Sequence, residues 1–170
     1  MTSCSGTVAN GSALDTSSVG TKSFSVTAID AVGNKTPVTN TFTVGYVSAG
    51  ICAGDLGHQI LQPTNADGSS VWKQGRTVPA KFRVCNANGI SIGTAGVVSS
   101  VALAQILNGT TADVDESVSS TSSDTSFRWD PSAQQWIFNI RTTNLSVGNT
   151  YVYRIQLNDG SSINFRFGLK

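Results

Sequence analysis

The sequence is poor in charge. Asp, Glu, Lys and Arg make up 12% of the 170 residues, and the formal net charge is +1. Binding to nucleic-acid phosphates or to anionic lipid requires a concentration of basic side chains, so the composition disfavours both partners. The sequence also contains no apolar run of about 18 residues, which a membrane-spanning helix needs. We therefore expect neither nucleic-acid binding nor membrane insertion.

Histidine occurs only once, as His58. A Ser-His-Asp or Cys-His hydrolase passes its proton through a histidine, so such a mechanism would depend on this residue alone. His58 has glycine and glutamine as neighbours, and the sequence contains no G-x-S-x-G nucleophile motif. Glycoside cleavage needs two facing carboxylates, and the acidic residues fall mostly at turn positions. We predict no catalytic residue and no enzyme activity.

Metal ligands are scarce as well. A structural zinc ion usually takes four Cys or His ligands, and the chain has three Cys and one His at irregular spacing. The densest acidic cluster, Asp113, Asp115 and Glu116, lies in the Ser- and Thr-rich segment 108–126, which we predict to be a long loop containing a short strand. Calcium needs six to eight oxygen ligands, and this spacing matches no known calcium loop. Solvated carboxylates are therefore the favoured interpretation, calcium is the alternative, and no metal or cofactor is predicted.

The three cysteines cannot all pair within the chain. Cys52 and Cys85 flank the opening of the second half and could form a disulfide. Cys4 would then need a partner outside this sequence. The residues before Cys4 lack the basic start and apolar stretch of a signal peptide, so we expect the leader of this protein to lie upstream in a longer precursor.

Alternating apolar and polar residues predict strands in the first region of the chain. Phe24, Val26 and Ala28 alternate with Ser and Thr, a turn follows at 30–34, and a second alternation runs from Val38 to Tyr46. This hairpin belongs to a region of fewer than 50 residues, which is too small to bury both faces of a sheet. We therefore predict half of a sandwich over residues 1–48, followed by a linker over residues 49–56.

The second region, residues 57–170, carries about seven strand patterns separated by turns, which favours an immunoglobulin-like sandwich. Its strands are expected near 78–84, 101–107, 127–129, 136–140, 151–157 and 163–169. Asp159-Gly160 between two alternating runs is a strong hairpin signal. Pro79 has no N–H to donate, so its strand is expected at a sheet edge or entering the sheet there. On that strand Lys81 should face away from the core. The predicted fold is all-β: an immunoglobulin-like antiparallel β-sandwich preceded by a partial second sandwich.

Two resemblances to known families follow these patterns. Residues 4–46 resemble the C-terminal half of HYR-like bacterial immunoglobulin-type repeats, through Cys4-Ser5-Gly6-Thr7-Val8, Asp15-Thr16-Ser17-Ser18-Val19-Gly20 and Phe24-Ser25-Val26-Thr27-Ala28. Residues 57–170 resemble the PxKF domain of exported bacterial proteins, through Pro79-Ala80-Lys81-Phe82, Phe127-Arg128-Trp129-Asp130, Gln135-Trp136-Ile137-Phe138-Asn139 and Leu157-Asn158-Asp159-Gly160. The second resemblance implies an extracellular sandwich appended to larger proteins and no particular activity.

These resemblances bear on the cysteines. In an exported domain a disulfide between Cys52 and Cys85 is more common than a metal site. In the HYR-like repeats the cysteine that matches Cys4 commonly has its partner upstream, in the half that this sequence lacks. We therefore expect a Cys52–Cys85 disulfide and a Cys4 that is unpaired or bonded outside the chain.

The aromatic residues suggest a glycan as an alternative partner. Together with Trp72 and Trp129, Trp136, Tyr151 and Tyr153 could form a surface on which sugars stack. Trp136, Tyr151 and Tyr153 are in phase with core residues, however, which favours core packing for these three. Trp72 lies in a turn-rich segment and is therefore the best candidate for an exposed ligand contact. The leading hypothesis is a structural spacer or terminal cap that contacts other domains or neighbouring subunits. The alternative is a carbohydrate- or surface-binding module.

Overall fold

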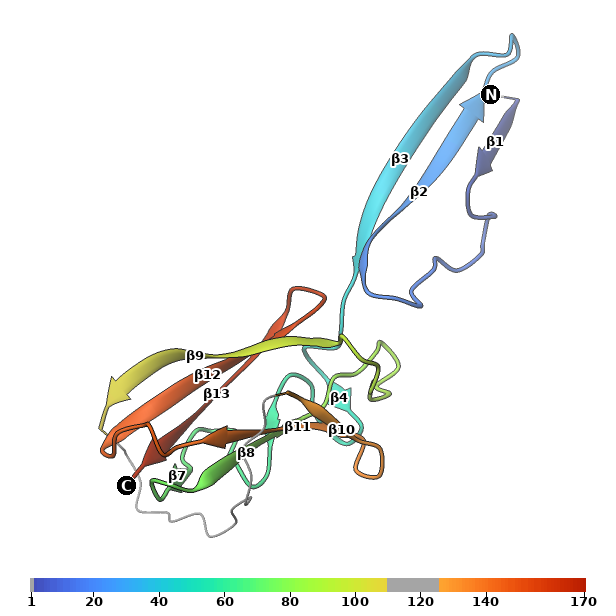
Figure 1. Cartoon of the computed structure of the whole chain (residues 1–170). Helices are drawn as coiled ribbons and strands as arrows, with labels where there is room; N and C mark the ends of the chain where they lie inside the picture. The colour runs from blue at the N-terminus through green and yellow to red at the C-terminus, as the bar shows by residue number, and fades with distance from the viewer. Residues whose placement is uncertain (1, 110–125) are drawn as a thin grey trace. The chain divides into compact units, whose positions relative to one another are not determined.

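The computed structural model describes residues 2–109 and 126–170, and within these ranges it contains strands and turns and no helix (Figure 1). None of the described residues forms a helix long and apolar enough to cross a membrane. The chain divides into two compact units, Met1–Gly45 and Tyr46–Lys170. The fold is thus all-β, as the alternating patterns predict.

The first unit is a three-stranded antiparallel sheet in the order β1-β2-β3. It consists of β1 (Ser3–Gly6), β2 (Gly20–Ile29) and β3 (Lys35–Val44). The long strands β2 and β3 pair along their whole length, whereas β1 pairs only with the second half of β2. The predicted hairpin is therefore present, and β1 adds one short strand to it.

Among its described residues, the second unit contains two four-stranded sheets and a small hairpin. The sheet orders are β10-β11-β8-β6 and β7-β13-β12-β9, and β4 pairs with β5. The strands are β4 (Ile51–Cys52), β5 (Asp55–Leu56), β6 (Ile60–Leu61), β7 (Val71–Trp72), β8 (Thr77–Phe82), β9 (Val98–Asn108), β10 (Arg128–Asp130), β11 (Gln135–Arg141), β12 (Asn149–Leu157) and β13 (Ser162–Leu169). All pairs within these sheets are antiparallel except β13 with β7.

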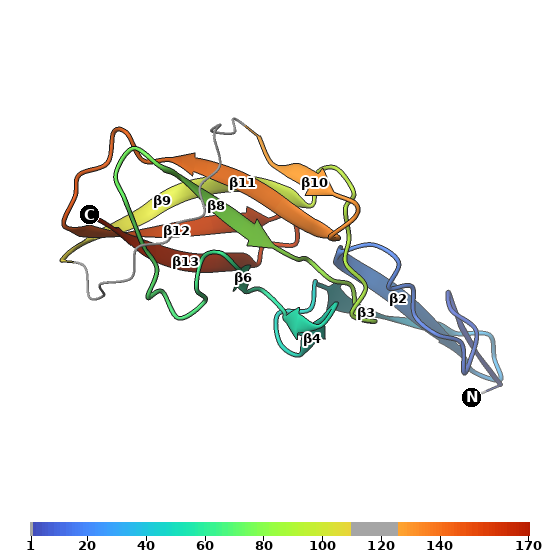
Figure 2. The same cartoon turned by 90° about the horizontal axis from the view of Figure 1, so that it is seen from below.

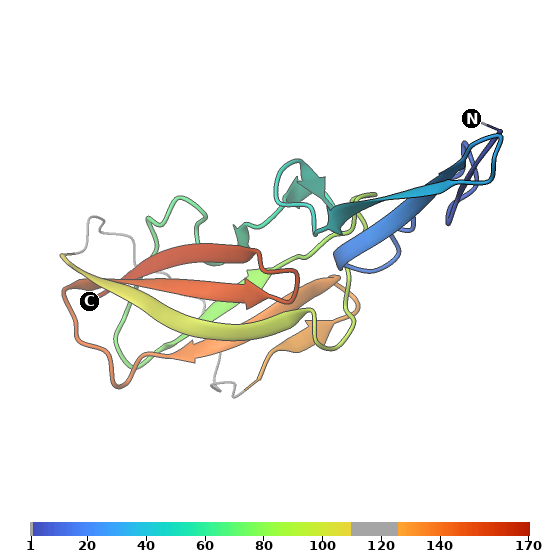
Figure 3. The same ribbon diagram turned by 90° about the horizontal axis from the view of Figure 1, so that it is seen from above.

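The two larger sheets pack face to face as a β-sandwich. In Figure 2 β8 and β11 lie in front of β9, β12 and β13, and in Figure 3 the two layers are seen from the opposite side. Alternate residues of each sheet fill the space between them, so that Val78, Ala80 and Phe82 of β8 are fully buried. The facing sheet contributes Tyr151, Ile155, Leu157, Ile163, Phe167 and Leu169 to the same core.

The strand with Pro79 is not at the edge that the sequence predicts, because β8 lies between β11 and β6. β6 is so short that it pairs only with Phe82 and Lys81. Opposite Pro79 the side-chain hydroxyl of Thr64 donates a hydrogen bond to the Pro79 carbonyl at 3.0 Å. The N–H and C=O of one strand residue point to the same side. The proline nitrogen therefore faces Thr64, away from β11, and the missing donor leaves the main ladder intact.

The segment that we expected to be a linker, residues 49–56, is folded. It forms the β4–β5 hairpin, and the second unit already begins at Tyr46. The segment is fixed by a disulfide from Cys52 and by a hydrogen bond from the backbone N–H of Ala53 to the Gly89 carbonyl at 3.1 Å. These long-range contacts hold a short segment that has no hydrophobic period of its own.

Candidate functional sites: an aromatic groove and an open sheet face

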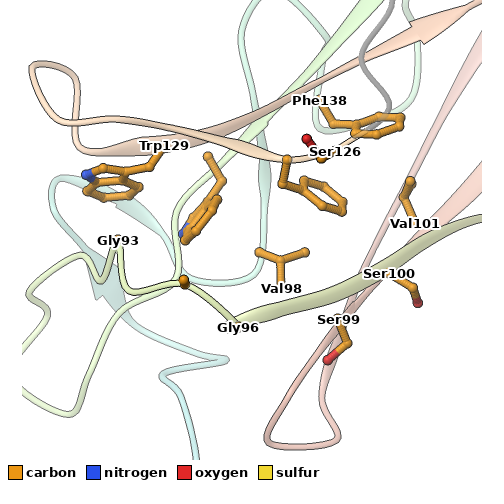
Figure 4. A pocket seen from close by; sticks show the side chains of 12 residues that line it. Gly93, Gly96, Val98, Ser99, Ser100, Val101, Ser126, Trp129 and Phe138 are labelled. Carbon is orange, nitrogen blue, oxygen red and sulfur yellow. The ribbon is translucent and has the colours of Figure 1, made fainter.

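An aromatic groove opens between the two sheets of the second unit, where β9 faces β10 and β11 (Figure 4). Its volume is about 860 Å³. Side chains from β9 form one wall and those from β10, β11 and the preceding residues form the other, namely Val98, Val101, Phe127, Trp129, Trp136 and Phe138. The exposed residues Ser99, Ser100 and Ser126 contribute hydroxyl groups to the lining. None of the described residues that line this groove is charged.

The aromatic rings in the groove are fixed by contacts with each other. The ring centroids of Phe127 and Phe138 are 4.9 Å apart, and those of Trp129 and Trp136 are 5.5 Å apart. Trp136 is 6% exposed, and its indole N–H donates a hydrogen bond to the Ile92 carbonyl at 2.8 Å. Ring pairs at these separations are favourable in their own right. The groove is therefore preformed.

The backbone of Gly93 packs directly against the indole of Trp129. A β-carbon added to Gly93 would lie 2.2 Å from Cε2 of that ring, so only glycine allows the backbone this close to the indole. Sequence reasoning missed Gly93, because no local pattern connects it with a tryptophan 36 residues later along the chain. The alternation around residues 127–138 predicts the strands that carry several of the ring side chains, but it does not predict the groove between the two sheets.

The structure contradicts the prediction that Trp72 is a ligand contact. Trp72 is 0% exposed and belongs to the core of the sandwich. Its strand, β7, pairs in parallel with the end of β13, where Trp72 lies opposite Leu169. This long-range pairing draws the turn-rich segment onto the sheet, and no ligand can reach the buried ring. Trp136 and Tyr151, in contrast, are buried as the periodicity predicts.

A second candidate surface is one face of the first unit, which we call the open face. Cross-strand partners lie on the same face of a sheet, so the pairs Cys4–Ala28 and Val26–Val38 are on the face that also carries Phe24. A groove of about 660 Å³ runs over this face, lined mainly by small and apolar residues that include Val8 and Leu14. The opposite face carries hydroxyl groups, such as those of Ser25 and Thr39, which are hydrogen-bonded at 2.7 Å.

The open face is only partly covered in this structure, because Phe24, Val26 and Ala28 are half-buried. No side chain among residues 2–45 is buried, whereas the second unit has a continuous core. Val38 is 55% exposed although it lies on the apolar face. Cys4 is a free, exposed thiol, and it lines the groove of this face.

Cys52 and Cys85 form the disulfide that we expected, with their Cα atoms 5.5 Å apart. Both residues are fully buried. The bond connects the β4–β5 hairpin to the segment that follows β8. Such bonds are typical of non-reducing compartments.

His58 lies beside Asp159, in a backbone conformation with φ of 54°. Burial lowers the pKa of the His58 imidazole, and the Asp159 carboxylate raises it by less, so that the net pKa is below 6.5. The His58 Nε2 atom is buried and has no hydrogen-bond partner among the described residues. Asp159 accepts hydrogen bonds from Tyr46 and Ser161. His58 is thus part of the packing around the entry to the second unit.

The remaining candidates have the following places in the structure. Lys81 is partly exposed, while its neighbours Ala80 and Phe82 are fully buried, so its side chain lies on the outer side of the sheet as predicted.

The acidic cluster Asp113, Asp115 and Glu116 and most of the loop predicted for 108–126 lie outside the described residues. Among the residues that are described, no group of three or more Cys, His, Asp or Glu side chains is placed to hold a metal ion.

The described residues define an all-β protein with one β-sandwich, which is antiparallel except for the β7–β13 pair, and one open sheet. Comparisons of the chain with protein-family models, with curated proteins and with solved structures give no match. The resemblances to the PxKF domain and to the HYR-like repeats therefore stay predictions.

Proposed function

We propose that this chain is a non-catalytic structural and interaction module of a bacterial surface or secreted protein. In this role it is a spacer or terminal cap, and its open face contacts a neighbouring domain or subunit by strand complementation. The buried Cys52–Cys85 disulfide supports an extracellular location, because such bonds persist in oxidising environments. The resemblance of residues 57–170 to the PxKF domain supports the part of the proposal in which this module is appended to a larger protein.

One observation carries the assembly part of this proposal: the first unit has an apolar sheet face and no buried side chain. A sheet of this kind gains stability only when a second layer covers its apolar face. An added strand or sheet would bury Phe24, Val26 and Val38, and it would also pair with a free edge of the sheet.

The thiol of Cys4 provides the test, because the other two cysteines are joined in a disulfide. In the monomeric chain we expect Cys4 to react with iodoacetamide within about threefold of the rate of a fully exposed thiol. The matched control is Val32→Cys in a Cys4→Ser background, since Val32 is 83% exposed in the β2–β3 turn. Covering the open face should slow Cys4 and leave the control unchanged. A Cys4 that is already slow in the monomer would show that the chain covers its own face, and the proposal would be wrong.

A second candidate function is favoured by the aromatic groove, which is uncharged over its described lining and combines partly exposed rings with serine hydroxyls. Sugars stack on aromatic rings and bond to neutral polar groups, so a neutral glycan fits this surface. Titration with cellohexaose, xylohexaose and chitohexaose, followed by tryptophan fluorescence, tests it. A saturable change that disappears in Trp129→Ala supports glycan binding. No change with any of the three, or a change that survives in Trp129→Ala, contradicts it for these sugars.

A further inference from the structure

The outer face of the β7-β13-β12-β9 sheet carries a group of basic and amide side chains. In Figure 3 β9, β12 and β13 lie in front of the other sheet, so this outer face is turned toward the viewer. Arg154 of β12 is the cross-strand partner of Asn164 of β13, and Val152 is the partner of Arg166. Partners and their diagonal neighbours on one face lie within reach of long side chains. Arg154, Asn164 and Arg166, which are all exposed, therefore form one surface group, which we call the arginine site.

The hydrogen bond between Arg154 and Asn164 decides which atoms of the arginine site remain free. The Arg154 Nε–H donates to the side-chain oxygen of Asn164 at 3.2 Å. An arginine nitrogen can only donate, so Asn164 turns its oxygen toward Arg154 and its NH₂ group away from this bond. That NH₂ group and the terminal nitrogens of Arg154 make no other hydrogen bond with the described residues. The free polar groups of both side chains are thus N–H donors.

Arg166 is held in place by the turn that precedes β7. Its guanidinium donates a hydrogen bond to the backbone carbonyl of Asp67 at 3.3 Å. Its side chain also crosses Gly68 so closely that a β-carbon there would lie 2.2 Å from the Arg166 Nε atom. Only glycine allows this approach. A segment about 100 residues earlier in the chain therefore positions the second guanidinium of the arginine site.

The arginine site carries an uncompensated positive charge. Neither Arg154 nor Arg166 forms an ion pair with a carboxylate of the described residues. Asp67 is the acid beside Arg166: hydrogen bonds from Ser69 and, to a smaller extent, the charge of Arg166 lower the pKa of its carboxyl. Two guanidinium groups against this one carboxylate leave one net positive charge. That charge matches a ligand with a single negative charge rather than a row of phosphates, which needs many basic side chains.

A shallow cavity of about 280 Å³ lies at the arginine site. Asn164 and Arg166 line it on one side, and Ala66 and Val152 add apolar surface. Ligand pockets usually have about 300 to 1,000 Å³, so this cavity has room for one small ring and not for a large ligand. Its lining combines N–H donors with a small apolar surface, which is the pair of contacts that a charged sugar ring needs.

We propose that the arginine site binds the carboxylate of an acidic sugar. Arg154, Asn164 and Arg166 donate hydrogen bonds to the carboxylate oxygens, and the sugar ring packs against Val152. A carboxylate offers acceptors only, so it satisfies the free donors, and its bonds with guanidinium groups are charge-assisted. The site shares no lining residue with the aromatic groove or with the groove of the open face. It adds a ligand to the module and does not depend on strand complementation.

Titration of the whole chain with digalacturonate, followed by NMR, tests the proposal. The Nε–H signals of Arg154 and Arg166 and the backbone amides of β12 and β13 report on the site directly. We expect saturable shifts with a Kd of about 1 mM at low salt, as suits a small and exposed site. The dimethyl ester of the same sugar has no charge and should give no saturable shift. No saturation with digalacturonate up to about 20 mM overturns the proposal, as does equal binding of the ester.

Three variants and one control examine the role of charge at the arginine site. Arg154→Gln and Arg166→Gln should each weaken binding at least about fivefold. The control is Lys35→Gln, because Lys35 is an exposed cation of the first unit, and this change should leave binding unaltered. Asp67→Asn keeps an acceptor for Ser69 but removes the opposing charge, so it should tighten binding about twofold or more. Binding that survives both arginine substitutions, or that weakens in Asp67→Asn, contradicts the proposal.

Other ligands and the other candidate surfaces give the remaining outcomes. Sodium acetate, galactose 6-sulfate and tetraglutamate should each bind more weakly than digalacturonate, because none combines a carboxylate with a sugar ring. Tighter binding of any of these overturns the assignment to an acidic sugar. Trp129→Ala in the aromatic groove and Phe24→Lys on the open face should leave the titration unchanged. Loss of digalacturonate binding in either variant would place the ligand elsewhere and overturn this site.

Discussion

Asp159, in the turn between β12 and β13, accepts a hydrogen bond of 2.8 Å from the backbone N–H of Tyr46, which lies 113 residues earlier in the chain. The Tyr46 hydroxyl donates a second bond to the side-chain oxygen of the neighbouring Asn158 at 2.8 Å. The first residue of the second unit is thereby attached to the hairpin that closes its core. The Asp159-Gly160 turn, a strong hairpin signal in the sequence, thus has a tertiary role as well as a local one.

The first prediction concerns this carboxylate. Burial raises the pKa of Asp159, but hydrogen bonds from Ser161 and from the backbone of Tyr46 lower it by more, so that the pKa lies below its usual 3.8. A lowered pKa means that the carboxylate stabilises the fold above pH 3.8, and that this contribution is lost as the pH falls through the folded-state value. Asp159→Asn should therefore cost about 1 kcal/mol at neutral pH and nothing in strong acid.

Urea unfolding at several pH values checks this prediction. All three tryptophans, Trp72, Trp129 and Trp136, lie in the second unit, so their fluorescence reports on its unfolding alone. The difference between the original chain and Asp159→Asn should shrink as the pH is lowered below about 4. A difference that is independent of pH would show that the lost charge is not its cause.

The second prediction concerns the disulfide. Cys52 and Cys85 are 33 residues apart, and closing a loop of this length stabilises a fold by roughly 3 to 4 kcal/mol in the chain-entropy model. Replacement of both residues by alanine should lower the free energy of unfolding of the second unit by about this amount. Denaturant titration gives the value, and Cys4→Ser is the control, which should leave it unchanged. A loss of less than about 1 kcal/mol would contradict the prediction.

The third prediction concerns Gly93. A methyl group at this position would collide with the indole ring of Trp129, whose Cε2 atom would lie 2.2 Å away. Gly93→Ala should cost about 1 to 3 kcal/mol, the range for an overpacked site, and it should shift the tryptophan emission spectrum. Gly96→Ala is the control. Gly96 has φ of 88° and open space around it, so this substitution should add backbone strain without moving the Trp129 indole. An unshifted spectrum in Gly93→Ala would show that this backbone does not fix the indole.

The sequence predicted the long strands of the second unit well, because their period-2 patterns are set locally by which side chains face the core. The strands near Val78, Val101 and Trp136 lie close to their expected limits. Features set by distant residues were missed. Trp72 has polar and turn-forming neighbours, but its burial depends on β13, about 100 residues later along the chain. The short strands β4 to β7 have too few residues to show a period.

The two candidate surfaces also differ in how far the sequence alone could predict them. The incomplete first sheet could be predicted, because the length of that region and its patterns already limit how much surface it can bury. The aromatic groove could not, since it forms where β9 meets β10 and β11 across two sheets. The sequence also did not predict that Leu103 and Ile106 are exposed, because the alternation of β9 is typical of an ordinary half-buried strand.

Hydrogen exchange of the monomeric chain tests the central claim, that the first unit is an incomplete sheet whose apolar face needs a partner. Amides open locally with a free energy set by the packing around them, and no side chain of residues 2–45 is buried. We predict that the amides of β2 and β3 exchange at least about 100-fold faster than those of β12 and β13 in the same molecule. Equal protection of the two pairs of strands in the monomer would contradict the account.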